Sequence, residues 1–199
     1  MSIVFYAAPR SSAMPVAWAL AELGVAHEKV VIDLASGAQR KPEFLRLNPN
    51  GKVPTLVVDG TPMFEALAIQ QWLGDRYGVE KGLWPAADAP ARLRALSWST
   101  WAYVTVGAAL GRLFFATGER LGADFRNEAQ VAYARQEIDG LLGLLDAQFE
   151  ASPYLLGDSF SLADLTVAST LGYAASTGVS LAGHASCQAR PSMAAVMSP

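Results

Sequence analysis

The residues best suited to chemistry lie in three short segments near the start of the chain. The first segment, Arg10-Ser11-Ser12, follows a short apolar run and precedes a stretch with helical propensity. A serine at the start of a helix is a common N-cap. The same hydroxyl is also placed to donate a hydrogen bond to a bound thiolate. Both interpretations apply to Ser11 and to Ser12.

The second segment, Asn48 to Thr55, combines two turn-forming pairs, Asn-Pro and Asn-Gly, with a proline that opens a β-branched strand. Proline has no amide hydrogen, so Pro54 belongs at the start or the edge of a strand. One interpretation is a plain turn that leads into the strand. The other is a cis Val53–Pro54 bond, which would turn the carbonyl and amide of Val53 outward to pair with an extended peptide ligand.

The third segment is Phe64-Glu65-Ala66, which precedes an expected helix. The first amides of that helix and the positive end of its dipole favour a carboxylate. Glu65 is placed to pair with the ammonium group of a ligand. Alternatively, Glu65 only complements the helix dipole.

Other kinds of site are disfavoured by what the chain lacks. The single cysteine, Cys187, cannot form an internal disulfide framework or a Cys-x-x-Cys site, and His27 and His184 have no metal-ligand spacing. No histidine is close enough in the sequence to Ser11 or Ser12 to suggest a Ser–His pair. The net charge of −3 argues against a nucleic-acid-binding surface. We therefore expect neither a metal nor a nucleic-acid partner.

The elements that position the three segments follow from the hydrophobic pattern of roughly the first 80 residues. Asp59-Gly60 is a hairpin signal between two strands, and Gly24 and Gly78 stand where helices would end. The predicted order is β-α-β-α-β-β-α, with strands at 3–6, 27–34, 53–58 and 62–64 and helices at 15–23, 41–47 and 65–77.

The remainder of the chain shows helical patterns only. A linker is predicted at 79–88, followed by helices at 90–117, 124–150 and 161–175 and a short one at 191–197. Ser161 and Asp164 mark one helix start, as an N-cap serine with an acid at the third helical position. With 199 residues, of which 52% are apolar and 17% charged, the chain can bury a sizeable core, and intrinsic disorder is excluded.

One uncharged stretch, from Leu165 to Ala189, is long enough to be compared with a membrane helix. Three glycines interrupt it and it is rich in serine and threonine, so we interpret it as a buried helix followed by a loop. The first ten residues lack the basic start of a signal peptide. We expect no membrane association and a cytoplasmic location.

Taken together, these segments resemble the glutathione S-transferase superfamily over nearly the whole chain, in particular its bacterial, serine-using members. Residues 48–54 are similar to the family's loop before a cis-proline, 64–69 to its glutamate-bearing turn, and 161–164 to the cap of its buried C-terminal helix. The resemblance implies an α/β thioredoxin-like domain at 1–78, the linker at 79–88, an all-α domain at 89–199 and a homodimer. It also makes a cis bond before Pro54 the expected conformation.

The resemblance also implies how glutathione would be held. The backbone of Val53, beside Pro54, would pair with the cysteinyl part, Lys52 would contact the glycyl end or the peptide, and Glu65 would hold the γ-glutamyl ammonium. Ala66 departs from the serine that many members carry, which removes one hydroxyl contact to the γ-glutamyl carboxylate. The amide of Ala66 remains, so weaker binding is expected rather than none.

For catalysis, the resemblance points to a tyrosine, serine or cysteine after the first strand. Ser11 is the first candidate and Ser12 the second, because Tyr6 lies within the strand and is expected to pack. The absence of cysteine there disfavours thiol-exchange chemistry.

The second substrate, a small hydrophobic electrophile, would contact Tyr103, Arg112 and Phe115. The expected activity is conjugation of glutathione, as a co-substrate, in detoxification. The alternatives are a glutathione-dependent isomerase or dehalogenase and a non-catalytic binding or scaffold protein.

Overall fold

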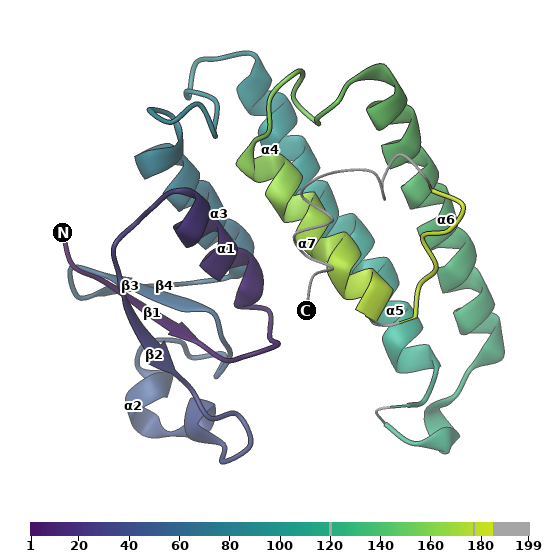
Figure 1. The fold of residues 1–199 in the computed structure, drawn as a ribbon. Helices are drawn as coiled ribbons and strands as arrows, with labels where there is room; N and C mark the ends of the chain where they lie inside the picture. Colours follow the sequence, from purple (N-terminus) through teal and green to yellow (C-terminus); the bar gives the residue numbers. More distant parts are fainter. Residues whose placement is uncertain (120, 177, 185–199) are drawn as a thin grey trace. The chain divides into compact units, whose positions relative to one another are not determined.

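The computed structural model describes residues 1–119, 121–176 and 178–184 of the chain. Within it the chain divides into two compact units, Met1–Asp88 and Ala89–Pro199. The first unit contains all the strands of the described residues, and the second contains helices (Figure 1). The predicted fold class, a thioredoxin-like α/β part followed by an all-α part, is confirmed.

The sheet of the first unit has four strands in the order β2-β1-β3-β4. Strand β1 pairs in parallel with β2 and antiparallel with β3, and β3 pairs antiparallel with β4. The strands are β1 (Ile3–Ala7), β2 (Glu28–Val31), β3 (Thr55–Val58) and β4 (Thr61–Phe64). Their order along the chain is the predicted one.

Strand β2 is shorter than the predicted strand at 27–34. It is an edge strand, paired only with β1. Beyond it, the carboxylate of Asp33 accepts hydrogen bonds from the amides of Ala35 and Ser36, which turns the chain away from the sheet.

The helices of the first unit cover both faces of this sheet. They are α1 (Met14–Glu22), α2 (Pro42–Leu45) and α3 (Ala66–Leu73), and α3 continues into a wide π-type turn at Gly74–Gly78. Helices α1 and α3 lie together on one face and α2 lies on the other (Figure 1). Phe5 is fully buried in the core, and its neighbour Tyr6 points to the opposite side, where its ring meets that of Phe44 of α2 edge-on at 6.0 Å. Tyr6 is therefore a packing residue, as expected.

The chain after α3 folds back onto the same unit. Trp84 is buried, and its indole N–H donates to the Asp75 carboxylate at 2.9 Å. A Cβ at Gly74 would lie 2.7 Å from the Trp84 ring, so only glycine allows this approach. Trp84 lies in the segment 79–88 predicted as a linker, and the first compact unit extends to Asp88.

The second unit is a bundle of helices. These are α4 (Ala91–Trp101), a wide π-type turn (Ala102–Val106), α5 (Gly107–Ala116), a single 3-10 turn (Ala123–Phe125), α6 (Glu128–Ala151) and α7 (Leu162–Ser176). Helix α5 packs against α6, and α4 packs against α7. Almost every residue of α7 up to Leu171 is buried, which explains its lack of charge after Asp164. No helix in the described part of the chain is both long and apolar enough to cross a bilayer.

Two helix starts can be compared with the sequence. Helix α6 begins after Asn127, whose side chain accepts from the amide of Gln130, whereas the predicted start, Asp124, lies in the preceding 3-10 turn. At α7, the Asp164 carboxylate accepts from the amide and the hydroxyl of Ser161 at 2.9 and 2.6 Å. The predicted pair of Ser161 and Asp164 therefore forms, with the serine hydroxyl donating to the acid.

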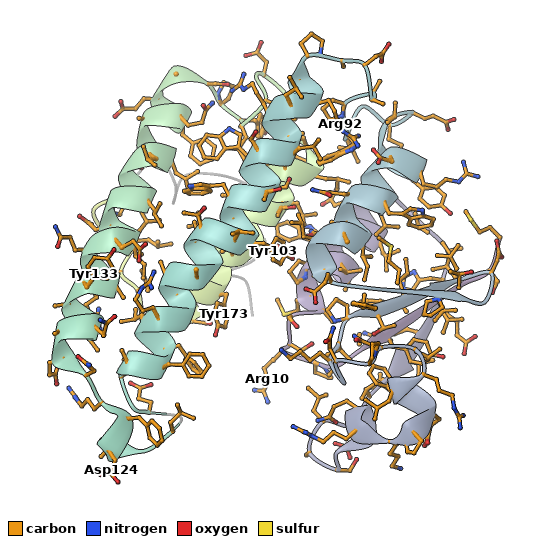
Figure 2. The ribbon with its side chains drawn as sticks, turned by 180° about the vertical axis from the view of Figure 1, so that it is seen from behind. Arg10, Arg92, Tyr103, Asp124, Tyr133 and Tyr173 are labelled. Atoms are coloured by element: carbon orange, nitrogen blue, oxygen red, sulfur yellow. The ribbon has the colours of Figure 1, made fainter. Side chains whose placement is uncertain are left out.

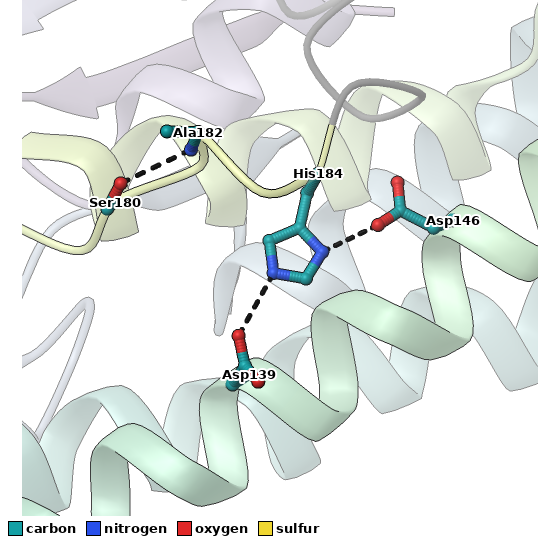
Figure 3. A network of polar contacts seen from close by, with 5 residues as sticks. All are labelled: Asp139, Asp146, Ser180, Ala182 and His184. Atoms are coloured by element: carbon teal, nitrogen blue, oxygen red, sulfur yellow. Dashed lines mark hydrogen bonds and ion pairs between the residues drawn. The ribbon is translucent and has the colours of Figure 1, made fainter.

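The segment after α7 attaches to α6 through a histidine. Nδ1 of His184 lies 2.6 Å from Asp146 Oδ2, and its Nε2 lies 3.2 Å from Asp139 Oδ1, so the ring is held between two carboxylates of one helix (Figure 3). This places residues 178–184 along α6. Cys187 and the helix predicted at 191–197 lie outside the described residues.

Candidate active site

The strand register brings the three chemically promising segments to one end of the sheet. Tyr6 near the end of β1 pairs with Thr55 at the start of β3, and Thr55 pairs with Phe64 at the end of β4. Because these neighbours are antiparallel, the loop after β1, the loop before β3 and the turn after β4 all leave the sheet at the same edge. Three segments that are far apart in the sequence, the loop after β1, the loop before β3 and the turn after β4, thus lie at one site.

The loop before β3 contains a cis peptide bond between Val53 and Pro54. This confirms the prediction made for Pro54. The side chain of Val53 is buried, and Lys52 beside it is exposed. In this loop, among the described residues, the amide of Val53 has no backbone acceptor, which leaves it available to a ligand.

Asn48 holds this loop from inside. It is only 2% exposed, and its Nδ2 donates to the Lys52 carbonyl at 2.7 Å and to Thr55 Oγ1 at 3.1 Å. Its Oδ1 accepts from the amide of Asn50 at 3.0 Å. The amide thus ties the residue before Val53 to the residue after Pro54. The Asn-Pro pair in the sequence indicates only a turn at Asn48, and its role inside the loop depends on contacts that the fold creates.

Gly51 is the one position of this loop where glycine is required by conformation and space together. Its φ is +60°, a value that side chains disfavour. A Cβ there would lie 3.1 Å from the carbonyl oxygen of Gln39. The loop is therefore packed closely against the turn at Ala38–Arg40.

The two candidate serines make different contacts. Ser11 Oγ donates to the Ala8 carbonyl at 2.6 Å and accepts from the amide of Ala13 at 3.2 Å, so it stabilises the turn that enters α1. Ser12 Oγ donates to the carbonyl of Val53 at 2.7 Å. Neither is the N-cap of α1, which is Ala13 and receives no side-chain cap. Ser12 therefore joins the loop after β1 to the cis-proline loop, while Ser11 bonds only locally.

Arg10 precedes these serines in an unusual backbone conformation. Its φ is +50°, in a region that residues other than glycine seldom occupy. Its side chain is exposed and extends away from the ribbon (Figure 2). The sequence offered no signal for this conformation, because arginine carries no preference for it.

Glu65 also has a positive φ, +71°, between β4 and α3. Residues held in such conformations cost energy and are concentrated at functional sites. Glu65 is exposed, and it immediately precedes Ala66, the first residue of α3. The carboxylate thus stands beside the first free amides of a helix, an arrangement suited to a ligand that carries both an ammonium and a carboxylate group.

The residues predicted to contact the electrophile lie in the second unit. Tyr103 is half-buried in the wide turn between α4 and α5 (Figure 2), and Phe115 is 52% exposed on α5. Arg112 pairs with Glu137 of α6 at 2.9 Å, and its guanidinium lies 5.5 Å from the centre of the Tyr133 ring. These contacts give Arg112 a role in joining α5 to α6.

Within residues 1–119, 121–176 and 178–184, no three His, Cys, Asp or Glu side chains gather closely enough to hold a metal ion. The groups that the sheet brings to this edge are two hydroxyls, a carboxylate and the backbone amides of Val53 and Ala66. They are hydrogen-bonding groups, and they suit a small peptide-like ligand with charged ends.

Comparison with known proteins agrees with this geometry. The profile of the glutathione S-transferase N-terminal domain matches residues 1–75, and that of the C-terminal domain matches residues 124–197. The chain is 32% identical to Glutathione S-transferase GstB of Escherichia coli over 75% of this chain and 71% of that protein. It is 29% identical to Disulfide-bond oxidoreductase YfcG of Escherichia coli, over 82% of this chain and 76% of that one.

A solved structure has a similar fold. The theta class glutathione S-transferase from the citrus canker pathogen Xanthomonas axonopodis pv. citri, solved with glutathione bound, is 28% identical and superposes with a TM-score of 0.78 over 100% of this chain and 98% of that one. The chain belongs to the glutathione S-transferase family of enzymes.

Proposed function

We propose that this protein binds glutathione at the edge of its sheet, stabilises the thiolate with Ser12, and transfers it to a small hydrophobic electrophile. The observation that carries the proposal is the contact between Ser12 and Val53, which places a hydroxyl beside the cis-proline loop. A relative with bound glutathione, from the citrus canker pathogen, supports the same ligand.

Each end of the tripeptide has a matching group in the first unit. The amide and carbonyl of Val53 pair with the cysteinyl backbone like an added strand. Glu65 pairs with the γ-glutamyl ammonium, and the amide of Ala66 at the start of α3 receives the γ-glutamyl carboxylate. Lys52, which is exposed beside Val53, faces the glycyl carboxylate.

Ser12, rather than Ser11, is the better donor to the sulfur. The hydroxyl of Ser11 is occupied on both sides by the backbone of its own turn. Ser12 is exposed and lies next to the residue that pairs with the cysteinyl part. A cysteine thiol has a pKa of about 8.5, and one charge-assisted hydrogen bond lowers it by roughly one to two units.

The reaction then needs no acid or base from the protein. The thiol proton leaves to solvent, and the sulfur lone pair forms a bond to the electrophilic carbon. In a substitution, the leaving group departs with the electron pair of its bond to carbon. In an addition, the π electron pair shifts away from the attacked carbon, and the resulting anion takes a proton from solvent. Holding both reactants together supplies the remainder of the rate acceleration. Tyr103 and Phe115 offer apolar surface to the electrophile, and a homodimer remains part of the proposal.

Conjugation of glutathione to 1-chloro-2,4-dinitrobenzene, followed by absorbance, tests the proposal. We expect turnover, and Ser12→Ala is expected to lower kcat by about 10- to 150-fold, the worth of one hydrogen bond to a charged group. Mass spectrometry of the products distinguishes consumption of glutathione from its regeneration in an isomerase or dehalogenase. Absence of glutathione binding in calorimetry would leave only a scaffold role.

A second candidate is reduction of disulfides by glutathione, favoured by the similarity to Disulfide-bond oxidoreductase YfcG. The segment after β1 carries Ser11 and Ser12 and no cysteine, so in this candidate both attacking sulfurs come from glutathione. Two glutathione molecules reduce one disulfide and become one molecule of oxidised glutathione. Activity with bis(2-hydroxyethyl) disulfide that exceeds activity with the chlorinated substrate would favour this candidate.

A further inference from the structure

The hydrogen bond between Ser12 and Val53 engages two groups that the proposed function assigns to different atoms of glutathione. Ser12 Oγ donates to the Val53 carbonyl oxygen at 2.7 Å. The same hydroxyl is the proposed donor to the sulfur, and the same carbonyl is the proposed acceptor for the cysteinyl N–H. A serine hydroxyl has one hydrogen, so it serves one of these acceptors at a time.

We propose that glutathione releases its own activating group. The cysteinyl N–H takes the place of Ser12 as the donor to the Val53 carbonyl, and the freed hydroxyl then turns its hydrogen to the sulfur. This inference rests on the proposed function. The S–H proton leaves to solvent, the electron pair stays on the sulfur, and Ser12 keeps its hydrogen throughout.

The surroundings of Ser12 permit this exchange without rearrangement of the fold. Its side chain is exposed, and the hydrogen moves by rotation about the Cβ–Oγ bond alone. Val53 is held from the other side, since the carbonyl of the preceding Lys52 is fixed by Asn48 at 2.7 Å. The acceptor therefore stays in place while its donor changes.

The neighbouring serine shows why this device belongs to Ser12. Ser11 donates to the Ala8 carbonyl, at 2.6 Å, and no ligand group is proposed to replace it there. The proposed ligand binds the acceptor of Ser12, the Val53 carbonyl, and leaves the acceptor of Ser11 as it is. In the free protein the Ser12 hydroxyl is therefore not available to small thiols that lack a peptide N–H. Activation of the thiol depends on binding of the peptide backbone to Val53.

The carbonyl of Val53 can be observed by itself, because the pair Val-Pro occurs once in the sequence. Protein labelled with carbonyl-13C valine and 15N proline gives one carbon resonance that is coupled to proline nitrogen. In the free protein we expect Ser12→Ala to move this resonance, because the carbonyl loses its donor. In the glutathione complex we expect wild type and variant to coincide, and Ser12→Thr, which keeps the hydroxyl, to match wild type in both states.

If the carbonyl resonance of Ser12→Ala differs from that of wild type by the same amount in the free and in the bound protein, the inference is overturned. Ser12 would then stay hydrogen-bonded to Val53 in the complex. Coincidence in the free protein would also overturn the inference, because it would mean that the contact is absent there. Ultraviolet absorbance of the bound thiolate against pH tests the proposed function separately. If Ser12→Ala leaves the thiol pKa of bound glutathione unchanged, the proposed role of Ser12 fails. If Ser12→Ala raises the thiol pKa of bound glutathione by about one to two units while Ser12 stays hydrogen-bonded to the Val53 carbonyl in the complex, only the exchange is refuted.

Discussion

Replacing Asn48 tests whether the glutathione site depends on the internal bracing of the cis-proline loop. The side chain makes three hydrogen bonds, to the carbonyl of Lys52, to Thr55 Oγ1 and from the amide of Asn50. At about 0.5–1.5 kcal/mol each, their loss in Asn48→Ala predicts a fall of about 1.5–4.5 kcal/mol in the free energy of unfolding. For a chain of this size that corresponds to a fall in Tm of roughly 3–18 °C.

Asn48→Ala should also weaken the binding of glutathione. Without Asn48, only the longer hydrogen bond from Thr55 Oγ1 to the Lys52 carbonyl, at 3.3 Å, joins Lys52 and Thr55 across Val53 and Pro54. A smaller fraction of the molecules then presents both backbone groups of Val53 in register. An affinity that depends on such a fraction falls in proportion to it. We expect the glutathione Kd, measured by calorimetry, to rise about tenfold or more. Thr55→Val removes the hydrogen bonds of Thr55 Oγ1 to Asn48 and to the Lys52 carbonyl but keeps the shorter one between Asn48 and Lys52, so it should give a smaller change in the same direction.

A matched control is Asn127→Ala, which removes the N-cap of α6 in the second unit. It costs about 0.5–2 kcal/mol of stability without touching the loop. Calorimetry is done well below the Tm of each variant. If Asn48→Ala lowers Tm but leaves Kd equal to that of Asn127→Ala, the argument that Asn48 positions Val53 is refuted.

Three further outcomes are expected. Glu65→Gln keeps the backbone but removes the charge that pairs with the ammonium, and because Glu65 is exposed the Kd for glutathione should rise only about two- to fivefold in calorimetry. Ala66→Ser adds a hydroxyl at the start of α3, and glutathione should bind about tenfold more tightly, which corresponds to the lower end of the free energy of a hydrogen bond to a charged group. An unchanged Kd would show that this hydroxyl does not reach the γ-glutamyl carboxylate. The hydroxyl and amide of Ser36 hold the pKa of Asp33 below its ordinary value, so its stabilisation is present above the unfolded pKa and is lost as pH falls through the folded one. Chemical denaturation from roughly pH 2 to 7 should show Asp33→Asn less stable than wild type at neutral pH and equal to it at the acid end.

The order of elements was predictable because it depends on local patterns. Alternating burial marks β1, and the pair Asp59-Gly60 forms the tight turn between β3 and β4, with positive φ at both residues. The start of α6 was also within reach. Asn127 is followed by Gln130 at the third helical position, which is a capping pattern, but the prediction began the helix at Asp124.

The contacts of the site were not predictable in the same way, because they join residues far apart in the sequence. Ser12 and Val53 are separated by 41 positions, and nothing local to either one specifies the other. Arg112 is similar: its partner Glu137 lies 25 positions away on the next helix, so a charge expected on the wall of a substrate site is engaged in packing α5 against α6. Local patterns identify which residues could act, and only the fold decides their partners.

The alanine at position 66 separates the part of the proposed glutathione site that depends on side chains from the part that depends on backbone. The positive φ of Glu65 is kept although the serine common at the next position is absent. Such a strained residue persists only where its surroundings determine it. Here the pairing of Thr55 with Phe64 fixes the chain before Glu65, and Gln70, whose Nε2 donates to the Pro15 carbonyl at 3.4 Å, fixes α3 against α1 after it. The amides that would receive the γ-glutamyl carboxylate are thus positioned by the fold, so a serine at position 66 should add affinity to an existing site and should not be needed to create one.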